Sequence, residues 1–520
     1  MGLQVGTWLL TGLLLHENLS AWGWNPMPAT IAAASMGSRP RNMPVLSASS
    51  IPVDDGSAGG RVMIVGEGGR EHCIAWSIAR KSKGVDSVLV APGNGGTAGL
   101  ASDGVINLNI PSSDLEGIVE AATRDGVDLV VIGPEAPLVS GLADSLRTAG
   151  VAVVGPGAAA ARLEGSKAWA KLFMDRHGVP TAMYQTFTNF EEGRDFLLEA
   201  RTRSHRLRSK DHSMAVTESG VAREGAGWAW GDLGVPPVVK ASGLAAGKGV
   251  VVPSTWEEAL EALRMIMVDK AFGEEAGAEV VIEERLEGPE VSVMAFCDGE
   301  LAVCAPGAQD HKRALEGDRG PNTGGMGAYC PAPYLVDAPS LREEVEAVMQ
   351  KVVTGMAKEG NPYHGVLFGG FVLTSNGPKV LEFNCRLGDP EAQAILPLLE
   401  GDLYELCRAC ASGGGELAAL VSRGGVHWAS DRGLSAACVV AASGGYPGPY
   451  VRGHEVTGVA QAELLEGVEV FHAGTALTGG GQGGGEGHLV SSGGRVVGVT
   501  GVGRGLEEAL ARAYQGIEKV

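Results

Sequence analysis

Four short apolar runs separated by amphipathic stretches lie between residues 61 and 155. The runs are 61–65 (RVMIV), 87–90, 128–132 and 151–155, and each has the length of a buried strand. The first is followed by a helical pattern from about Arg70 to Lys81. Alternating strands and helices predict an α/β fold with a doubly wound parallel sheet, in which ligands bind at the carboxyl ends of the strands.

The pattern changes in the middle of the chain. A helix is expected from Lys167 to a stop at Gly178, and a second helix is expected to end near Glu199. The polar stretch 201–237 carries no motif, and we interpret it as a surface insertion. Further on, the apolar runs 365–373 and 379–384 flank an Asn-Gly turn and predict a β-hairpin.

Turns rich in glycine or proline follow the early strands. Gly66, Gly68 and Gly69 come directly after the first strand, and similar turns lie at 92–97, 133–138 and 155–157. Such turns let a ligand approach the backbone and direct helix N-terminal amides at an anion, although glycines in these units also serve tight packing alone. Glu71 stands where a dinucleotide fingerprint needs its third glycine, so a small phosphorylated ligand is the better expectation.

A second glycine-rich loop, 243–249 (GLAAGKG), contains one cation, Lys248. It is not a Walker A motif, because the first two glycines are one residue too close and Gly249 replaces the magnesium-binding Ser or Thr. Two interpretations remain open from the residues alone. The loop is either a mobile lid over phosphates or a plain hairpin turn.

Carboxylates and a carboxamide mark the ends of two later strands. Glu382 and Asn384 alternate along one strand and share a face, which places Leu381 and Phe383 toward the core. Such oxygen ligands suit Mg²⁺, and Arg386 and Asp389 follow immediately, which favours function over packing. By contrast, the carboxylates at 283, 284 and 290 would each be read alone as solvated surface groups.

Composition narrows the choice of partners. The chain has 41 Lys and Arg against 61 Asp and Glu, a formal net charge of −20, which argues against a nucleic acid partner.

The eight cysteines are dispersed, as expected for reduced thiols in a core. Cys407 and Cys410 form a C-x-x-C on an amphipathic stretch, where helix packing is favoured over redox or metal chemistry.

Residues 1–58 differ in composition from the rest of the chain. The apolar run at 8–15 is far shorter than the roughly 20 residues that span a bilayer. From Asn18 to Val53 the chain carries Arg39 and Arg41 but no Lys and no acid. This composition predicts a cleaved organellar targeting segment, with the plastid as the first expectation and the mitochondrion as the second. The alternative is an unstructured extension or a mis-assigned start.

Eight motifs, in their order along the chain, resemble those of the phosphoribosylamine–glycine ligase family, the glycinamide ribonucleotide synthetases of the ATP-grasp superfamily. The resemblance extends from about Arg61 to Tyr514 and rests on GEGGREH (66–72), APGNGGT (91–97), GPEAPL (133–138), LEGSKAW (163–169), KASGLAAGKGV (240–250), QDHKR (309–313), GPNTGGMGAY (320–329) and LEFNCRLGDPE (381–391). The insertion 201–237 departs from the family pattern.

The resemblance implies an α/β ATP-grasp enzyme with three parts. These are an N-terminal doubly wound substrate domain (60–161), a split ATP-grasp domain (162–400, with the insertion) and a small C-terminal α+β domain (431–520). The implied reaction joins glycine to 5-phosphoribosylamine with ATP and Mg²⁺, or Mn²⁺ in its place. The implied enzyme is a monomer or weak homo-oligomer without a nucleic acid or membrane partner.

The resemblance also implies roles for single residues. For the nucleotide, Lys167 and Lys240 would hold phosphates beneath a lid containing Gly247, Lys248 and Gly249, Glu283 would contact the adenine and Glu290 the ribose. Glu382 and Asn384 would bind the metal, Arg386 would stabilise the activated carboxylate, and Asp310 would attract the glycine ammonium. The residues that would receive 5-phosphoribosylamine are Gly66, Gly68, Gly69, Asn94 and Glu135. A purine-pathway carboxylase of the same superfamily and a non-catalytic paralogue are the rival readings.

Overall fold

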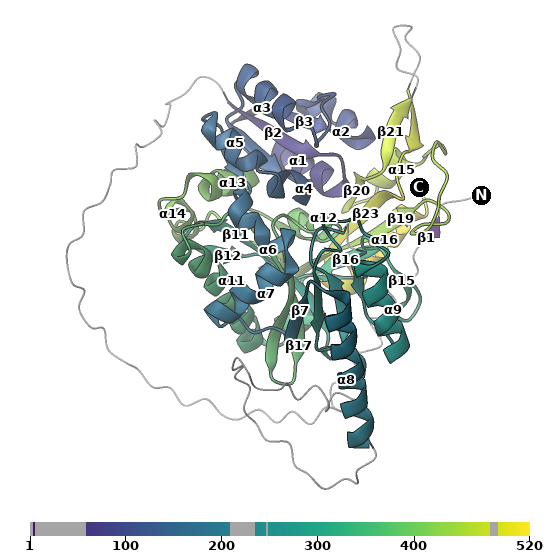
Figure 1. The fold of residues 1–520 in the computed structure, drawn as a ribbon. Helices are drawn as coiled ribbons and strands as arrows, with labels where there is room; N and C mark the ends of the chain where they lie inside the picture. Colours follow the sequence, from purple (N-terminus) through teal and green to yellow (C-terminus); the bar gives the residue numbers. More distant parts are fainter. Residues whose placement is uncertain (1–3, 6–58, 209–234, 246–247, 479–486) are drawn as a thin grey trace, which may run out of the picture.

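The computed structural model describes residues 4–5, 59–208, 235–245, 248–478 and 487–520 (Figure 1). The predicted targeting segment therefore lies outside the described residues apart from Gln4–Val5, as do 209–234 of the predicted insertion and Gly247 of the predicted lid. In the part of the chain that is described, no helix is long and apolar enough to cross a membrane.

The N-terminal part is the predicted doubly wound sheet. Five parallel strands lie in the order β4-β3-β2-β5-β6, with bounds β2 Gly60–Gly66, β3 Val85–Pro92, β4 Val105–Asn107, β5 Leu129–Ile132 and β6 Ala152–Val154. The connecting helices are α1 Gly69–Lys81, α2 Gly95–Gly99, α3 Leu115–Arg124, α4 Glu135–Val139, α5 Leu142–Thr148 and α6 Ala158–Gly165.

Alternation along β2 explains why both faces of this sheet are covered. Val62 and Ile64 join the hydrophobic cluster that contains α1, whereas Met63 and Val65 join the cluster that contains α3 and α5. Successive side chains of a strand point to opposite faces, so a fully apolar strand needs a layer on each side. The helix α13 (Leu403–Ser412) joins α1 on the first face.

Two antiparallel sheets form the ATP-grasp part. The first has the order β7-β10-β8-β9, with β7 Tyr184–Phe187, β8 Val238–Ala241, β9 Val250–Val251 and β10 Val280–Glu283. The second has the order β12-β11-β17-β18, with β11 Glu290–Asp298, β12 Ala302–Cys304, β17 His364–Thr374 and β18 Gly377–Asn384. The helices of this part are α7 Lys167–His177, α8 Phe190–Arg208, α9 Trp256–Met267, α10 Pro333–Val336, α11 Pro339–Lys358, α12 Glu391–Ile395 and α14 Glu416–Ser422.

The predicted hairpin is present, with one irregularity. Strands β17 and β18 pair from Thr374 opposite Gly377 onward, but a bulge places Gly370 opposite Glu382 and Phe371 opposite Val380 and leaves Leu381 unpaired. Phe383 is buried as expected, whereas Leu381 is only partly buried, so the prediction for Leu381 was wrong. A bulge shifts the facing of side chains locally and cannot be read from alternation.

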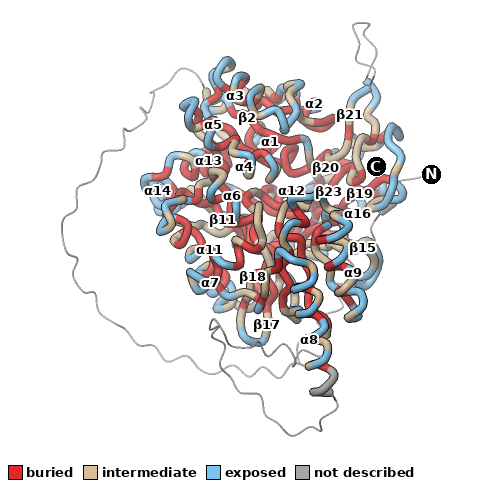
Figure 2. The backbone as a smooth tube through the Cα atoms, in the orientation of Figure 1, coloured by how far each residue is buried: buried red, intermediate tan, exposed pale blue. Residues whose placement is uncertain are grey.

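The expected end of the second helix near Glu199 was also wrong. Helix α8 continues through Arg208 and projects from the body of the molecule (Figure 2). Its residues Leu197 and Ala200 are buried in one hydrophobic cluster with α9 and the adjacent sheet. Arg201 Nη2 lies 2.9 Å from Glu257 Oε1 of α9. Residues 201–208 of the polar stretch therefore belong to a helix, and its interpretation as a surface insertion stays a prediction.

The C-terminal sheet takes strands from two of the predicted domains. Its order is β13-β16-β19-β23-β20, and β13 (Gln309–Asp310) and β16 (Gly327–Cys330) come from the predicted ATP-grasp range. The remaining strands are β19 Leu434–Ala442, β20 Val468–His472 and β23 Arg495–Arg504, and β1 (Gln4–Val5) pairs with β19. Two hairpins, β14 Arg313–Leu315 with β15 Arg319–Asn322 and β21 Thr475–Thr478 with β22 His488–Ser491, and helices α15 Val459–Glu463 and α16 Gly505–Ile517 complete this part.

The cysteines behave as predicted. All eight are free thiols, and Cys407 and Cys410 are buried on α13 in the core between the N-terminal sheet and β11. Burial raises the pKa of the Cys407 thiol to about 12, with a smaller contribution from Asp402. The C-x-x-C therefore serves helix packing.

Candidate active site

The two antiparallel sheets bring predicted phosphate-binding and metal-binding residues together. Lys240 on β8 donates from Nζ to the backbone oxygen of Leu381 on β18, at 3.2 Å. Glu382 follows that residue directly. The contact therefore brings a predicted phosphate-binding residue of one sheet close to a predicted metal-binding residue of the other.

Glu283 is the centre of a buried charge cluster that the sequence did not predict. Its carboxylate pairs with Lys240 and with Lys171, whose Nζ lies 2.7 Å from Oε2. The side chains of Glu283 and Lys171 are 2% and 3% exposed. Burial raises the pKa of the Glu283 carboxyl, but Lys240 and Lys171 outweigh it and hold the pKa below the ordinary value.

This cluster rules out one interpretation of Glu283 and adds Lys171 to the candidate site. The alternative of a solvated surface carboxylate is wrong, whereas the contact of Glu283 with adenine stays a prediction. Lys171 was missed, although it stands four residues after Lys167 and therefore on the same side of helix α7. That spacing was the one available signal.

Lys167 lies at the base of the predicted lid. It is the first residue of α7, its backbone N donates to Ser242 O at 2.8 Å, and its Nζ reaches Gly243 O at 3.5 Å. Burial lowers the pKa of the Lys167 ammonium, while Glu382 opposes that shift. On the far side of the loop, Lys248 is exposed and Gly249 O accepts from Ala241 N at 2.8 Å.

Glu382 and Asn384 form a donor set that fits Mg²⁺. Burial raises the pKa of Glu382, but Lys312, Lys240 and Lys167 outweigh it and lower the pKa, which keeps the carboxylate ionised. The described residues contain no cluster of three or more His, Cys, Asp or Glu side chains suited to a metal. One carboxylate and one carboxamide oxygen, completed by phosphate oxygens and water, is the coordination that Mg²⁺ tolerates well.

Arg386 connects the predicted metal site to the predicted substrate site. Its Nη2 donates to Asn384 Oδ1 at 3.1 Å, and its Nε lies 3.4 Å from Glu135 Oε2 at the start of α4. A third partner is Glu164 of α6, at 3.3 Å, which the sequence did not reveal. Burial raises the pKa of Glu135, yet Arg386 outweighs it and lowers the pKa; for Glu164, burial prevails and the pKa is raised.

Lys312 joins two residues with predicted roles. Its Nζ lies 3.8 Å from Asp310 Oδ2 and 3.7 Å from Glu290 Oε2. Asp310 lies on β13 with a largely buried side chain, and Glu290 begins β11 with an exposed one. Asp310 raises the pKa of the Lys312 ammonium above its ordinary value. Lys312 belongs to the QDHKR motif but had not been assigned a role.

Glu391 is a further buried carboxylate near Asp310. It begins α12, is 4% exposed, and accepts from Ser292 Oγ at 3.1 Å. Burial raises its pKa from 4.5 to about 7, and Asp310 adds to the rise. The folded protein therefore holds this proton more tightly than the unfolded chain does, so the free energy of unfolding falls as the pH rises from about 4.5 to about 7.

We expect Glu391→Gln to remove this decrease of the free energy of unfolding with rising pH. Between pH 5 and pH 8 the unchanged protein should lose about 2 kcal/mol more unfolding free energy than the variant, since one pKa unit corresponds to about 1.36 kcal/mol. Urea unfolding of both proteins at the two pH values measures the difference. Parallel pH profiles would show that Glu391 does not bind this proton in the folded state.

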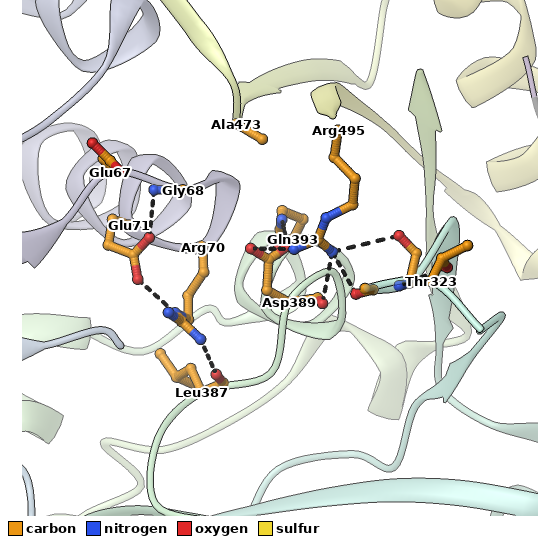
Figure 3. A network of polar contacts seen from close by, with 12 residues as sticks. Glu67, Gly68, Arg70, Glu71, Thr323, Leu387, Asp389, Gln393, Ala473 and Arg495 are labelled. Atoms are coloured by element: carbon orange, nitrogen blue, oxygen red, sulfur yellow. Dashed lines mark hydrogen bonds and ion pairs between the residues drawn. The ribbon is translucent and has the colours of Figure 1, made fainter. Parts of the chain in front are cut away.

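The glycine turn after β2 is closed by Glu71. Gly68 N donates to Glu71 Oε2 at 2.6 Å, and Arg70 Nε lies 2.6 Å from Glu71 Oε1 (Figure 3). Gly66 has φ of +129°, and a Cβ there would lie 2.6 Å from Glu71 Cγ. The side chain of Glu71 thus occupies the Gly68 amide in this structure, and the binding of 5-phosphoribosylamine by Gly66, Gly68 and Gly69 stays a prediction.

The side chain of Asn94 makes several hydrogen bonds within the protein. Its Nδ2 donates to Glu67 O and His472 O, both at 2.8 Å, and its Oδ1 accepts from Gly96 N at 2.8 Å. The carboxamide thus ties the turn after β3 to the turn after β2 and to β20. These bonds fix the position of Asn94, and its contact with 5-phosphoribosylamine stays a prediction.

Three parts of the chain meet beside the Gly68 turn. Arg495 of β23 donates from Nη1 to Gly324 O at 2.6 Å and Asp389 O at 2.9 Å, and its Nη2 lies 3.2 Å from Asp389 Oδ2 (Figure 3). Arg70 of α1 donates to Leu387 O at 3.0 Å. The N-terminal and C-terminal parts therefore both fix the segment that follows β18.

Comparison with known proteins assigns all three parts to one family. The N domain, the ATP-grasp (A) domain and the C domain of phosphoribosylglycinamide synthetase match residues 60–164, 229–392 and 436–520. These matches support the three predicted parts but leave their boundaries as predictions.

Relatives and solved structures agree. The chain is 47% identical over 460 residues to the trifunctional purine biosynthetic protein adenosine-3 of Homo sapiens, covering 88% of this chain and 40% of that protein. It therefore spans less than half the length of this relative. It is 43% identical to the phosphoribosylamine–glycine ligase of Rhodopirellula baltica, covering 88% of this chain and 94% of that protein.

The crystal structure of phosphoribosylamine–glycine ligase from Thermotoga maritima has a TM-score of 0.65 at 33% identity, covering 88% of this chain and 96% of that one. A biotin carboxylase from Campylobacter jejuni has a TM-score of 0.61 at 13% identity, which shows the ATP-grasp fold alone. The predicted fold and family are confirmed: the chain belongs to the phosphoribosylamine–glycine ligase family of ATP-grasp enzymes.

Proposed function

We propose that this chain joins glycine to 5-phosphoribosylamine with ATP, giving glycinamide ribonucleotide, ADP and phosphate in de novo purine biosynthesis. One observation carries the proposal most directly. Arg386 links Asn384, assigned to the metal, to Glu135, assigned to 5-phosphoribosylamine, through contacts of 3.1 and 3.4 Å. The relative of Rhodopirellula baltica, 43% identical, bears the name of this ligase.

The nucleotide would lie between the two antiparallel sheets. Lys167 and Lys240 would bind its phosphates, Glu290 its ribose hydroxyls, and the loop that includes Gly243 and Gly249 would cover it and exclude water. Glu382 and Asn384 would hold Mg²⁺, with Mn²⁺ as a possible substitute, and the ion would neutralise charge on the β- and γ-phosphates. The ion pairs of Glu283 keep Lys240 directed at this space.

Activation of glycine is needed because a carboxylate is inert to an amine. A carboxylate oxygen of glycine attacks the γ-phosphorus, ADP leaves, and glycyl phosphate forms. Arg386 stabilises the charge on the acyl phosphate, and Asp310 attracts the glycine ammonium. The amine of 5-phosphoribosylamine, held near Glu135, then attacks the carbonyl carbon, loses a proton and expels phosphate.

An omission assay tests this proposal. Purified protein should form ADP and glycinamide ribonucleotide in equal amounts only when ATP, Mg²⁺, glycine and 5-phosphoribosylamine are all present. Replacement of glycine by bicarbonate should stop the reaction. ADP formation that requires bicarbonate would identify a carboxylase instead, and absence of turnover with ATP binding intact would identify a non-catalytic paralogue.

We further infer that residues 1–58 direct the chain to an organelle, the plastid before the mitochondrion, and that the remaining chain acts as a monomer or weak homo-oligomer. The support is compositional, since 18–53 contains two arginines and no acid or lysine. Residues 1–58 fused to a fluorescent reporter should carry it into the organelle. A reporter that stays in the cytosol would contradict the inference.

A further inference from the structure

Glu164 stands where a carboxylate is unfavourable. It lies in the last turn of α6 (Ala158–Gly165) and is 8% exposed. The C-terminal end of a helix carries partial negative charge, so an acidic side chain there is disfavoured. Burial of a carboxylate adds a desolvation cost unless partners compensate for it. Such a position indicates that the carboxylate of Glu164 has a functional role.

Both oxygens of Glu164 contact the segment that follows the metal-binding strand. Oε2 accepts from Cys385 N at 2.6 Å, and Oε1 lies 3.3 Å from Arg386 Nη2. The same helix receives the Cys385 thiol, whose Sγ lies 3.7 Å from Ala161 O. Helix α6 therefore holds the chain at the first two residues after Asn384.

The guanidinium of Arg386 is thus fixed from three directions. Glu164 lies on one side, Asn384 Oδ1 accepts from Nη2 at 3.1 Å, and Glu135 Oε2 lies 3.4 Å from Nε. Without Glu164, the remaining partners are Asn384 Oδ1, the backbone oxygen of Leu387 at 3.3 Å from Nη1, and the carboxylate that is assigned to the substrate site. Arg386 could then turn toward Glu135 and away from the phosphate that it must stabilise.

We propose that Glu164 is a positioning residue that holds Arg386 in the orientation required for glycyl phosphate formation. This inference rests on the proposed function. The negative charge of Glu164 positions Arg386 through the ion pair with its guanidinium, in addition to the hydrogen bond that Glu164 accepts from Cys385 N. The substitution Glu164→Gln separates the two contacts, since glutamine retains an acceptor for Cys385 N–H but presents no charge to Arg386.

Steady-state kinetics of Glu164→Gln test the proposal. We expect kcat to fall about 10- to 100-fold, because small misplacement of a reacting group has effects of about this size. The KM for ATP should stay within about twofold of its original value, since Lys167, Lys240 and Glu290 are unchanged. Glu120→Gln, an exposed change on α3, is the matched control and should leave both constants unaltered.

A thermal unfolding cycle with Arg386→Met supplies a second measurement that does not depend on turnover. Glu164→Gln should lower the Tm of the unchanged protein but raise the Tm of Arg386→Met, where Glu164 is left as a buried anion without its cation. Equal Tm losses in both backgrounds, or a folded Glu164→Gln protein with unchanged kcat, would overturn the proposal. Failure of the unchanged protein to form glycinamide ribonucleotide would instead refute the proposed function.

Discussion

Replacement of Glu382 by glutamine is expected to lower kcat by at least about 1000-fold, or about 4 kcal/mol of barrier. The carboxylate is held ionised among Lys312, Lys240 and Lys167, whose positive charges outweigh the effect of burial on its pKa. Glutamine keeps the shape but removes the charge that a divalent ion requires. The metal that neutralises the phosphates would then bind weakly.

The folded structure should tolerate this change. Glu382 is only partly buried, and its strand is held by the pairing of β18 with β17. Turnover measured over a range of Mg²⁺ concentrations, together with the circular dichroism spectrum, tests the expectation. Glu343→Gln, an exposed change on α11, is the control. Near-normal turnover of folded Glu382→Gln at limiting Mg²⁺ would remove Glu382 from the metal site.

Replacement of Glu283 by glutamine is expected to lower the free energy of unfolding by about 3–5 kcal/mol, the range for breaking a buried ion pair. Lys171 and Lys240 would remain as cations with side chains 3% and 5% exposed and without their shared anion. Lys240 would also lose the carboxylate that directs it. The KM for ATP should therefore rise as well.

The neighbouring Glu284 provides a matched control. It pairs with Lys379 at 3.5 Å with a side chain 17% exposed, so Glu284→Gln should cost less than about 1 kcal/mol. Urea unfolding measures both variants. The loss in Glu283→Gln should shrink as the pH rises toward the ordinary lysine pKa of 10.5, because burial lowers the pKa of Lys171 and the folded variant releases that proton before the unfolded chain does. Equal losses at positions 283 and 284 would contradict the buried cluster.

Elements with a strong local pattern could be predicted from the sequence. The apolar run RVMIV became β2 because it is buried on both faces, and the Asn-Gly turn placed the β17–β18 hairpin correctly. The strands β13 and β16 could not be assigned to the C-terminal sheet, since two to four residues carry no periodic signal and β19, with which β16 pairs, lies more than 100 residues away.

In the candidate site, too, residues close in sequence could be predicted, whereas partners from distant segments could not. Glu382, Asn384 and Arg386 stand together in the sequence, and the structure keeps them together through the contact of Arg386 with Asn384. The partners Glu164 and Lys171 come from distant helices, and pairing across more than 100 residues is invisible to local pattern. The backbone amide of Gly68 donates to Glu71 and the carboxamide of Asn94 donates to backbone oxygens, and only the folded turns reveal these partners.

The transfer of oxygen from glycine to phosphate tests the central claim most directly. With glycine labelled by ¹⁸O in its carboxylate, the attack on the γ-phosphorus carries one labelled oxygen into the acyl phosphate, and the amine later expels that oxygen with the phosphate. The account predicts one ¹⁸O atom in each phosphate released per glycinamide ribonucleotide formed, at full enrichment of the glycine. Phosphate that contains only oxygen from ATP and water would contradict activation through glycyl phosphate at this site.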